Sequence, residues 1–98
     1  MTTFAERLAE DRRLVILRLL AEANSEANES LLALALSDYG HRVSRDQTRT
    51  DLAWLREQGL VEIEELGGLQ IARLTQRGFE ASSGIITVPG VRRPTPKG

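Results

Sequence analysis

The fold is decided by residues 51–78, which read DLAWLREQGLVEIEELGGLQIARLTQRG. Over 61–65, apolar and acidic residues alternate, and this period is typical of a β-strand with one buried face. A second strand is predicted over 70–74. Gly67 and Gly68 lie between the two runs and suit a tight turn, whose central residues need positive φ. The sequence therefore predicts a short β-hairpin here.

Helices are predicted on both sides of this hairpin. Downstream, Thr75 caps a short helix that runs to about residue 82, with Phe79 as its anchor in the core. Upstream, Ser44 caps a helix that Gly59 ends, because glycine readily takes the left-handed conformation found at helix C-termini. Gln47 follows Ser44 at the spacing of a capping box.

Two further helices are predicted nearer the N-terminus, over about 3–23 and from 28 or 30 to about 39. In the first, Leu8 and later residues at helical spacing face the core, and other apolar residues lie on a different side. A helix that is apolar on two faces needs a second partner. That partner is either the C-terminal segment of the same chain or a second copy of this helix, and we favour a homodimer. The residues assigned to the dimer contact are Leu14, Leu17 and Ala21.

The composition is that of one globular domain. The chain has 98 residues, of which 41% are hydrophobic and 28% charged, and its net charge is −1. It has no cysteine and a single histidine, His41, so we expect no metal site and no cofactor. No signal peptide, no membrane span and no catalytic constellation is recognisable, so we expect a cytoplasmic protein that is not an enzyme.

The domain itself is predicted to cover residues 1–83, and 84–98 to form an extended C-terminal arm outside the core. Prolines at 89, 94 and 96 exclude further helix or central strand from this segment. Arg92, Arg93 and Lys97 make the arm basic. Such an arm could follow DNA phosphates or enter a minor groove, or it could be a free, soluble tail.

The predicted order of elements is helix, helix, helix, hairpin, helix, in a mainly α protein. This α-α-α-β-β-α order is that of a winged helix-turn-helix domain, in which the third helix lies against DNA and the hairpin forms the wing. Over roughly residues 10–82 the chain also resembles transcriptional regulators of the ArsR and MarR type. It is similar in particular to small ArsR-like proteins of Mu-type prophages, several of which end in a tail like VPGVRRP. The residues that carry the resemblance are Leu52, Leu55, Gly59, Leu60 and Val61 before the hairpin, and Leu74, Thr75 and Gly78 after it.

The resemblance implies a homodimeric regulator, expected to be a repressor, that binds a specific double-stranded DNA site through the third helix. Arginine can contact guanine and glutamine can contact adenine in the major groove, while hydroxyl groups can bind phosphate. The alternative is that these are ordinary solvated residues of a surface helix. The residues assigned to DNA contact are Arg42, Ser44, Arg45, Asp46, Gln47, Arg49, Thr50, Arg73, Arg92 and Arg93.

The wing departs from the pattern of DNA-binding relatives because its first strand carries Glu62, Glu64 and Glu65. Either these glutamates point away from DNA, or the wing contacts protein, so a protein-interaction module without DNA binding is the alternative function. The DNA hypothesis requires that Arg45 and Arg49 be free to reach a duplex. Arginines occluded at a subunit contact, or surrounded by carboxylates, would contradict it.

Trp54 and His41 are each the only residue of their type in the chain, and both are expected to have structural roles. Trp54 is expected to be half-buried and to anchor the third helix on the core. His41, in the turn before that helix, is expected to lie at the surface or to cap a helix.

Overall fold

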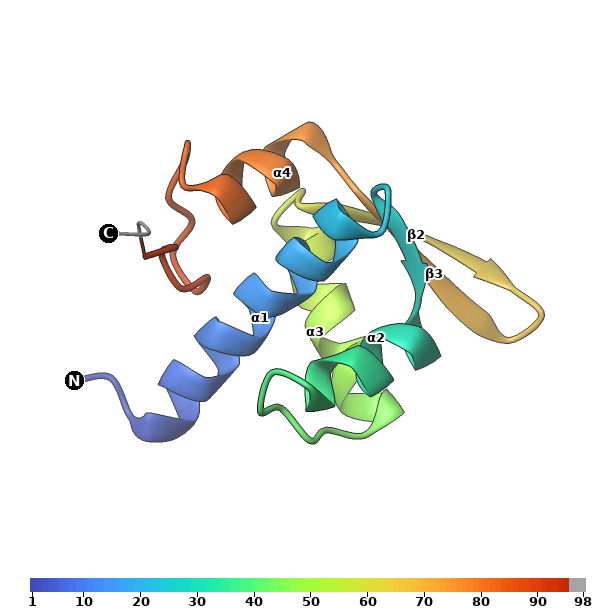
Figure 1. The fold of residues 1–98 in the computed structure, drawn as a ribbon, viewed down its shortest axis with the longest axis horizontal. Coiled ribbons are helices and arrows are strands. Elements are labelled where there is room, and N and C mark those ends of the chain that lie inside the picture. The colour runs from blue at the N-terminus through green and yellow to red at the C-terminus, as the bar shows by residue number, and fades with distance from the viewer. Residues whose placement is uncertain (96–98) are drawn as a thin grey trace.

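The computed structural model describes residues 1–95 and shows a mixed α+β architecture (Figure 1). Four helices and one three-stranded antiparallel sheet make up this part of the chain. The β2–β3 hairpin lies at one end of the molecule, and α4 lies on the opposite side of α1 from α2 (Figure 1). The elements are α1 (Phe4–Glu22), β1 (Glu26–Asn28), α2 (Glu29–Ser37), α3 (Arg45–Glu57), β2 (Val61–Leu66), β3 (Leu69–Leu74) and α4 (Gln76–Ser83).

Each helix begins at a polar N-cap whose side chain accepts a hydrogen bond from a backbone N–H of the first turn. The caps are Thr3, Asn28, Ser44 and Thr75. Such caps satisfy N–H groups that have no partner within the helix. The predicted caps of the third and fourth helices are confirmed. At the other end of α4, Gly84 takes a left-handed conformation with φ of 84°.

The sheet has the strand order β1-β3-β2, and its hairpin is the predicted one. Gly67 and Gly68 have φ of 57° and 77°, as a tight turn requires. The strand β1 was not predicted. It has only three residues and little apolar character, and it pairs with β3 through Ala27 opposite Ala72. Its place in the sheet depends on a partner 45 residues away, which local periodicity cannot reveal.

The core lies between α1 and the other elements, and it corrects the predicted faces of α1. Leu14 and Leu17 are completely buried within the chain, so they cannot form the predicted dimer contact. Ala21 is half-buried. Leu8, expected in the core, is 40% exposed. The second apolar face of α1 is covered by α4 and the C-terminal segment, the alternative partner that the sequence left open.

The C-terminal segment is therefore not a free arm. Val88 and Val91 belong to the core, at 3% and 8% exposure. The backbone N–H of Arg92 donates to the carbonyl of Glu10 on α1. Because the apolar half of α1 would otherwise face water, burial of the two valines stabilises the segment against it. The prediction that residues after 83 form an arm outside the core is wrong up to residue 95, and residues 96–98, with Lys97, lie outside the described residues.

Gly78, rather than Phe79, anchors α4. Phe79 is 45% exposed, whereas Gly78 and Ala81 are buried. A Cβ atom on Gly78 would lie 2.0 Å from the carbonyl oxygen of Leu60. Only a glycine lets α4 approach the start of β2 so closely, and the helix is thereby rotated so that Phe79 faces outward.

Trp54 is half-buried, as predicted. The guanidinium of Arg13 lies 4.1 Å from its ring centroid, and the same arginine donates a hydrogen bond of 2.8 Å to the carbonyl of Gly90. The indole ring therefore joins α1, α3 and the C-terminal segment. Among residues 1–95, no helix combines the length and the apolar character needed to cross a bilayer.

Candidate functional site

A buried glutamate organises the surface formed by α2, α3 and the hairpin. Glu29, the first residue of α2, is completely buried. Its Oε1 atom accepts hydrogen bonds from Nε of Arg45 (3.0 Å) and Nε of Arg49 (2.6 Å). Its Oε2 atom accepts from Nη2 of Arg49 (2.9 Å) and from the backbone N–H of Gln70. One carboxylate thus holds two arginines of α3 and a strand of the hairpin.

The turn of the hairpin joins the same network. The carbonyl of Gly68 accepts from Nη2 of Arg45 (3.0 Å) and from Nη2 of Arg49 (2.8 Å). The tip of the hairpin is consequently fastened beside the N-terminal half of α3. We call these residues the Glu29 cluster: Glu29, Arg45, Arg49, Gly68 and Gln70.

The electrostatics of the cluster follow from its hydrogen bonds. The hydrogen bonds from Arg49 are the largest influence on Glu29, and with those from Gln70 and Arg45 they outweigh burial and lower its pKa to about 2. Conversely, the hydrogen bonds to Glu29 raise the pKa of Arg49. The carboxylate is therefore ionised at neutral pH, and the two guanidiniums together with it carry a net charge of +1.

This arrangement corrects the expectation that the two arginines are free to read bases. Both are bound to a carboxylate, and Nη2 of Arg49 is also 4.0 Å from the carboxylate of Glu65. The pairing with Glu29 and Glu65 counts against free reading of bases by these arginines. They are not occluded, because 51% of the Arg45 side chain and 34% of the Arg49 side chain remain exposed. Each guanidinium thus uses Nε and Nη2 for the cluster, while its side chain stays partly exposed.

Several other residues assigned to DNA contact lie on the exposed side of α3 near its N-terminus. The exposed ones are Arg42, Ser44, Asp46 and Thr50. Gln47 is different, because it is half-buried. Its amide nitrogen lies 3.4 Å from Oδ1 of Asp51, so it does not complete the predicted capping box. We therefore remove Gln47 from the outward surface.

Arg73 is held between two carboxylates on the outer face of the sheet. Its Nε atom donates to Glu26 and its Nη2 atom to Glu64, both at 2.6 Å, and these hydrogen bonds raise its pKa. Glu62 lies opposite Arg73 in the strand register and on the same face. The outer face of the sheet is thus acidic, and Arg73 is not the free wing cation that was predicted.

The histidine prediction is also wrong. His41 is only 5% exposed, and its Nε2 atom lies 2.7 Å from a carboxylate oxygen of Asp11. The other oxygen of Asp11 accepts from Arg92, which fixes this arginine against α1, while Arg93 is exposed. Burial alone would raise the pKa of Asp11, but the hydrogen bonds from His41 and Arg92 outweigh it and lower that pKa.

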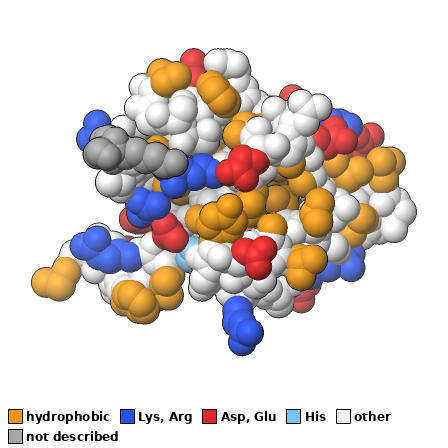
Figure 2. All heavy atoms as spheres, in the orientation of Figure 1, with side chains coloured by type: hydrophobic (Ala, Val, Ile, Leu, Met, Phe, Trp, Pro, Cys, Tyr) orange, Lys and Arg blue, Asp and Glu red, His pale blue; other side chains and the backbone are white. Residues whose placement is uncertain are grey.

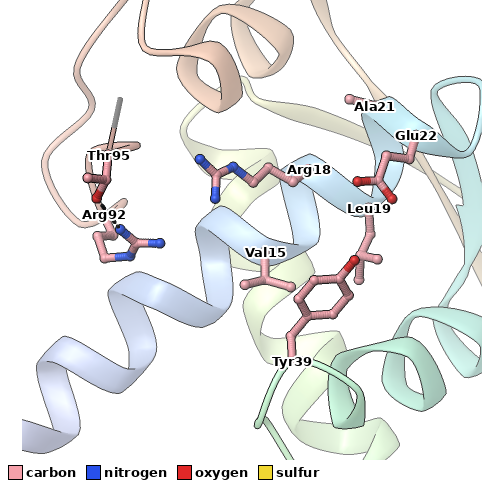
Figure 3. Close-up of a pocket in the computed structure, with 8 residues that line it drawn as sticks. All are labelled: Val15, Arg18, Leu19, Ala21, Glu22, Tyr39, Arg92 and Thr95. Carbon is pink, nitrogen blue, oxygen red and sulfur yellow. Dashed lines mark hydrogen bonds between the residues drawn. The ribbon is translucent and has the colours of Figure 1, made fainter. Parts of the chain in front are cut away.

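A second notable surface is apolar and lies between α1 and α2. Figure 2 shows hydrophobic side chains gathered in the middle of this face. Leu31 and Tyr39 are each 53% exposed, and two hollows that share Leu19 and Glu22 join them. In the first hollow, of about 460 Å³, Val15, Leu19 and Tyr39 lie side by side, and Arg18 extends toward Arg92 (Figure 3). We call Leu19, Leu31, Ala35 and Tyr39 the α1–α2 apolar surface.

Sequence reasoning missed Glu29 entirely. It is the first helical residue after the Asn28 cap, a position where acidic residues are common for the sake of the helix dipole. The only local signal of burial is the run of leucines and alanines that follows it. Its arginine partners are 16 and 20 positions away, and nothing in their spacing indicates a shared carboxylate. Within residues 1–95, no group of three histidine, cysteine, aspartate or glutamate side chains could hold a metal ion.

Together the fold and the site define a small α+β protein whose main polar feature is an arginine-rich helix clamped to a β-hairpin. The chain belongs to the family of the uncharacterized protein gp26 of Escherichia phage Mu. The two sequences are 52% identical over 90 residues, covering 92% of this chain and 94% of the phage protein. An uncharacterized protein of Haemophilus influenzae is 49% identical over 82 residues, which cover 83% of this chain and 80% of that protein. No protein-family model matches the chain.

Proposed function

We propose that the protein is a winged helix-turn-helix regulator that binds double-stranded DNA in the cytoplasm and acts as a repressor by occupying its site. The observation that carries the proposal is the relation between α3 and the hairpin. The helix α3 follows α2 after a seven-residue connector, residues 38–44, which is longer than the tight turn usual for the motif. One side of the N-terminal half of α3 is exposed and carries Arg45 and Arg49, and the hairpin tip is fixed beside it. A recognition helix and a wing have this relation in winged-helix proteins that contact a major groove.

The charge distribution supports contact with the DNA backbone more than base reading by Arg45 and Arg49. Their Nε and Nη2 atoms are used for the Glu29 cluster, and a positive charge at the N-terminal end of a helix favours phosphate. Arg42 lies in the turn before α3 and is exposed, and Thr50 is exposed one turn into the helix. Glu62 and Glu64 lie on the face of the sheet away from the core, so these two can point away from DNA, whereas Glu65 lies 4.0 Å from Nη2 of Arg49 and borders the proposed surface.

We further propose that the protein acts as a homodimer, through the α1–α2 apolar surface instead of Leu14, Leu17 and Ala21. Exposed leucine and tyrosine side chains that join in one patch are typical of interaction sites. Arg18 and Glu22 border Leu19 on α1, and neither forms an ion pair with the described residues. In a two-fold dimer with antiparallel α1 helices, each arginine would meet the glutamate of the second copy.

The direct test is a fluorescence anisotropy titration of a labelled random-sequence duplex with the wild type and two variants. Wild-type affinity should fall steeply between about 50 and 200 mM salt, because each phosphate contact releases counterions. The R42A variant should bind more weakly at every salt concentration, with a salt slope smaller by about one unit. R7A is the matched control, because Arg7 is an exposed arginine on α1 that makes no side-chain hydrogen bond with the described residues.

A protein-interaction module is the second candidate, and the acidic outer face of the sheet favours it. Around Arg73, the three carboxylates of Glu26, Glu62 and Glu64 leave this face negative. Such a surface repels DNA and suits a basic protein partner. Absence of duplex binding by the wild type at low salt would reject DNA binding and favour this second function.

A further inference from the structure

Burying the Glu29 carboxylate costs free energy, so its position needs an explanation beyond packing. Removing a carboxylate from water is unfavourable, and even a well-paired buried carboxylate is often no more stable than an apolar residue of similar size. Yet Glu29 is completely buried, and four donors from α3 and β3 converge on its two oxygens. Its hydrogen bonds join α2, α3 and β3. The hydrogen bonds from Arg45 and Arg49 to Gly68, and the approach of Arg49 to Glu65, add further charged links between α3 and the hairpin.

We propose that Glu29 is a positioning residue for DNA binding: it holds Arg45, Arg49 and the hairpin tip as one rigid surface that receives backbone phosphate. This inference rests on the proposed function, because it assigns a role within the same DNA surface. In this role Arg45 and Arg49 contact phosphate and set the register of the protein on the duplex. Other residues then read the base sequence.

The remaining donors of the two arginines support a phosphate contact. A guanidinium has five N–H groups. Arg49 uses Nε and both hydrogens of Nη2 for Glu29 and Gly68, so its Nη1 group is left for a ligand. Arg45 uses Nε and one hydrogen of Nη2. Both side chains are partly exposed, so these remaining donors can reach a phosphate oxygen.

Fixing these donors in advance should strengthen binding. A free arginine loses conformational entropy when it settles on a phosphate, whereas these two are ordered before DNA arrives. The same carboxylate accepts from the backbone N–H of Gln70, so the hairpin cannot move relative to α3 without breaking a charge-assisted hydrogen bond. A duplex therefore meets the helix and the wing at one fixed spacing.

The test compares E29Q with D51N. Asp51 is the matched control because it is also a buried carboxylate bound to an arginine, Arg12, but it faces α1 and does not touch the hairpin. Two quantities are measured: affinity for the labelled random-sequence duplex, and hydrogen exchange of the Gln70 amide. E29Q should lose about tenfold in affinity, the effect of losing one fixed charged contact. Its Gln70 amide should exchange faster, while D51N should leave both quantities near their wild-type values.

Folded E29Q that binds DNA as tightly as the wild type, or more tightly, would overturn the inference. If the wild type binds no duplex, the proposed function fails by itself, and the exchange rate of Gln70 still decides whether Glu29 holds the hairpin. Unchanged exchange in E29Q overturns that role. If E29Q does not fold, E29D replaces it. Aspartate keeps the charge but withdraws the carboxylate by one methylene, and it should weaken binding and speed the exchange of Gln70.

Discussion

Glu29 and Asp51 are both buried carboxylates paired with arginine, and they show how the fold converts scattered charges into fixed contacts. The sequence indicated correctly that Arg42, Ser44 and Thr50 are exposed at the start of the third helix. It did not indicate the pairing of Arg45 and Arg49. Helical spacing reports which face a residue occupies, but whether a charge is free depends on partners that tertiary structure brings from elsewhere.

The double variant R45A/R49A should be strongly destabilised. It leaves the Glu29 carboxylate buried without its guanidinium partners, and such a loss costs about 3 kcal/mol. We expect the midpoint of thermal unfolding to fall by about 15 °C. R42A and R7A should unfold near the wild-type temperature, because both arginines are exposed. A double variant that melts with the wild type would mean that the cluster contributes nothing to folding. Because R45A/R49A should be destabilised, loss of DNA binding in this variant is not evidence that the two arginines contact DNA directly.

Acid should also weaken the fold through Glu29. Its pKa is about 2 in the folded state and 4.5 ordinarily, so ionisation favours the folded state. This contribution is complete above pH 4.5 and is lost as the pH falls toward 2. Urea unfolding at a series of pH values should show a steeper decline in the free energy of unfolding for the wild type than for E29Q. Asp11 has a lowered pKa too, so some decline should persist in E29Q. Parallel curves for the two proteins would contradict this assignment.

At the scale of elements, the hairpin and four helices were predictable because each has a local signal: alternation, a Gly-Gly turn, or a polar cap. Two features were not. The strand β1 is defined by its pairing with β3, and residues 84–95 are held by contact of Val88 and Val91 with the core. The prolines in that segment were correctly read as excluding helix. They do not exclude packing as irregular chain.

The junction of α4 with the hairpin depends on Gly78. In G78A, the new Cβ would meet the carbonyl oxygen of Leu60 at 2.0 Å, and this oxygen belongs to the backbone and cannot rotate away. We expect a loss of about 2 to 3 kcal/mol in the free energy of unfolding, typical of an overpacked site. Chemical denaturation measures it. Q76A, an exposed substitution on the same helix, should change stability by less than about 0.5 kcal/mol. Equal stability of G78A and the wild type would show that α4 can move away from β2 without cost.

At the scale of the whole molecule, the apolar residues of α1 exceed what one face could bury, and the sequence left two ways to cover them. The structure uses α4 and the C-terminal segment for Leu14 and Leu17. It still leaves Leu31 and Tyr39 half-exposed on the opposite side, next to Leu19. The first argument for a dimer is therefore lost, because the chain itself covers the second apolar face of α1. The proposed dimer rests instead on the exposed side chains of Leu31 and Tyr39, which lie outside α1.

Sedimentation velocity tests this dimer. The wild type should sediment as a dimer, and L31E should sediment as a monomer, because a carboxylate would be buried in the contact. F79E is the matched control: Phe79 is also an exposed apolar residue, but it lies on α4, away from the α1–α2 apolar surface.

The charged border of that surface gives a sharper version of the same test. In a two-fold contact, R18E places like charges opposite each other and should shift the equilibrium toward monomer. Adding E22R exchanges the two charges and restores opposite signs across the axis, so R18E/E22R should recover the dimer. If the contact does not bring Arg18 close to Glu22 of the second copy, adding E22R should not restore the dimer. Monomeric wild type, or a double variant as weak as R18E alone, would therefore reject this interface, and the proposed DNA binding would then need a form of the protein other than this dimer.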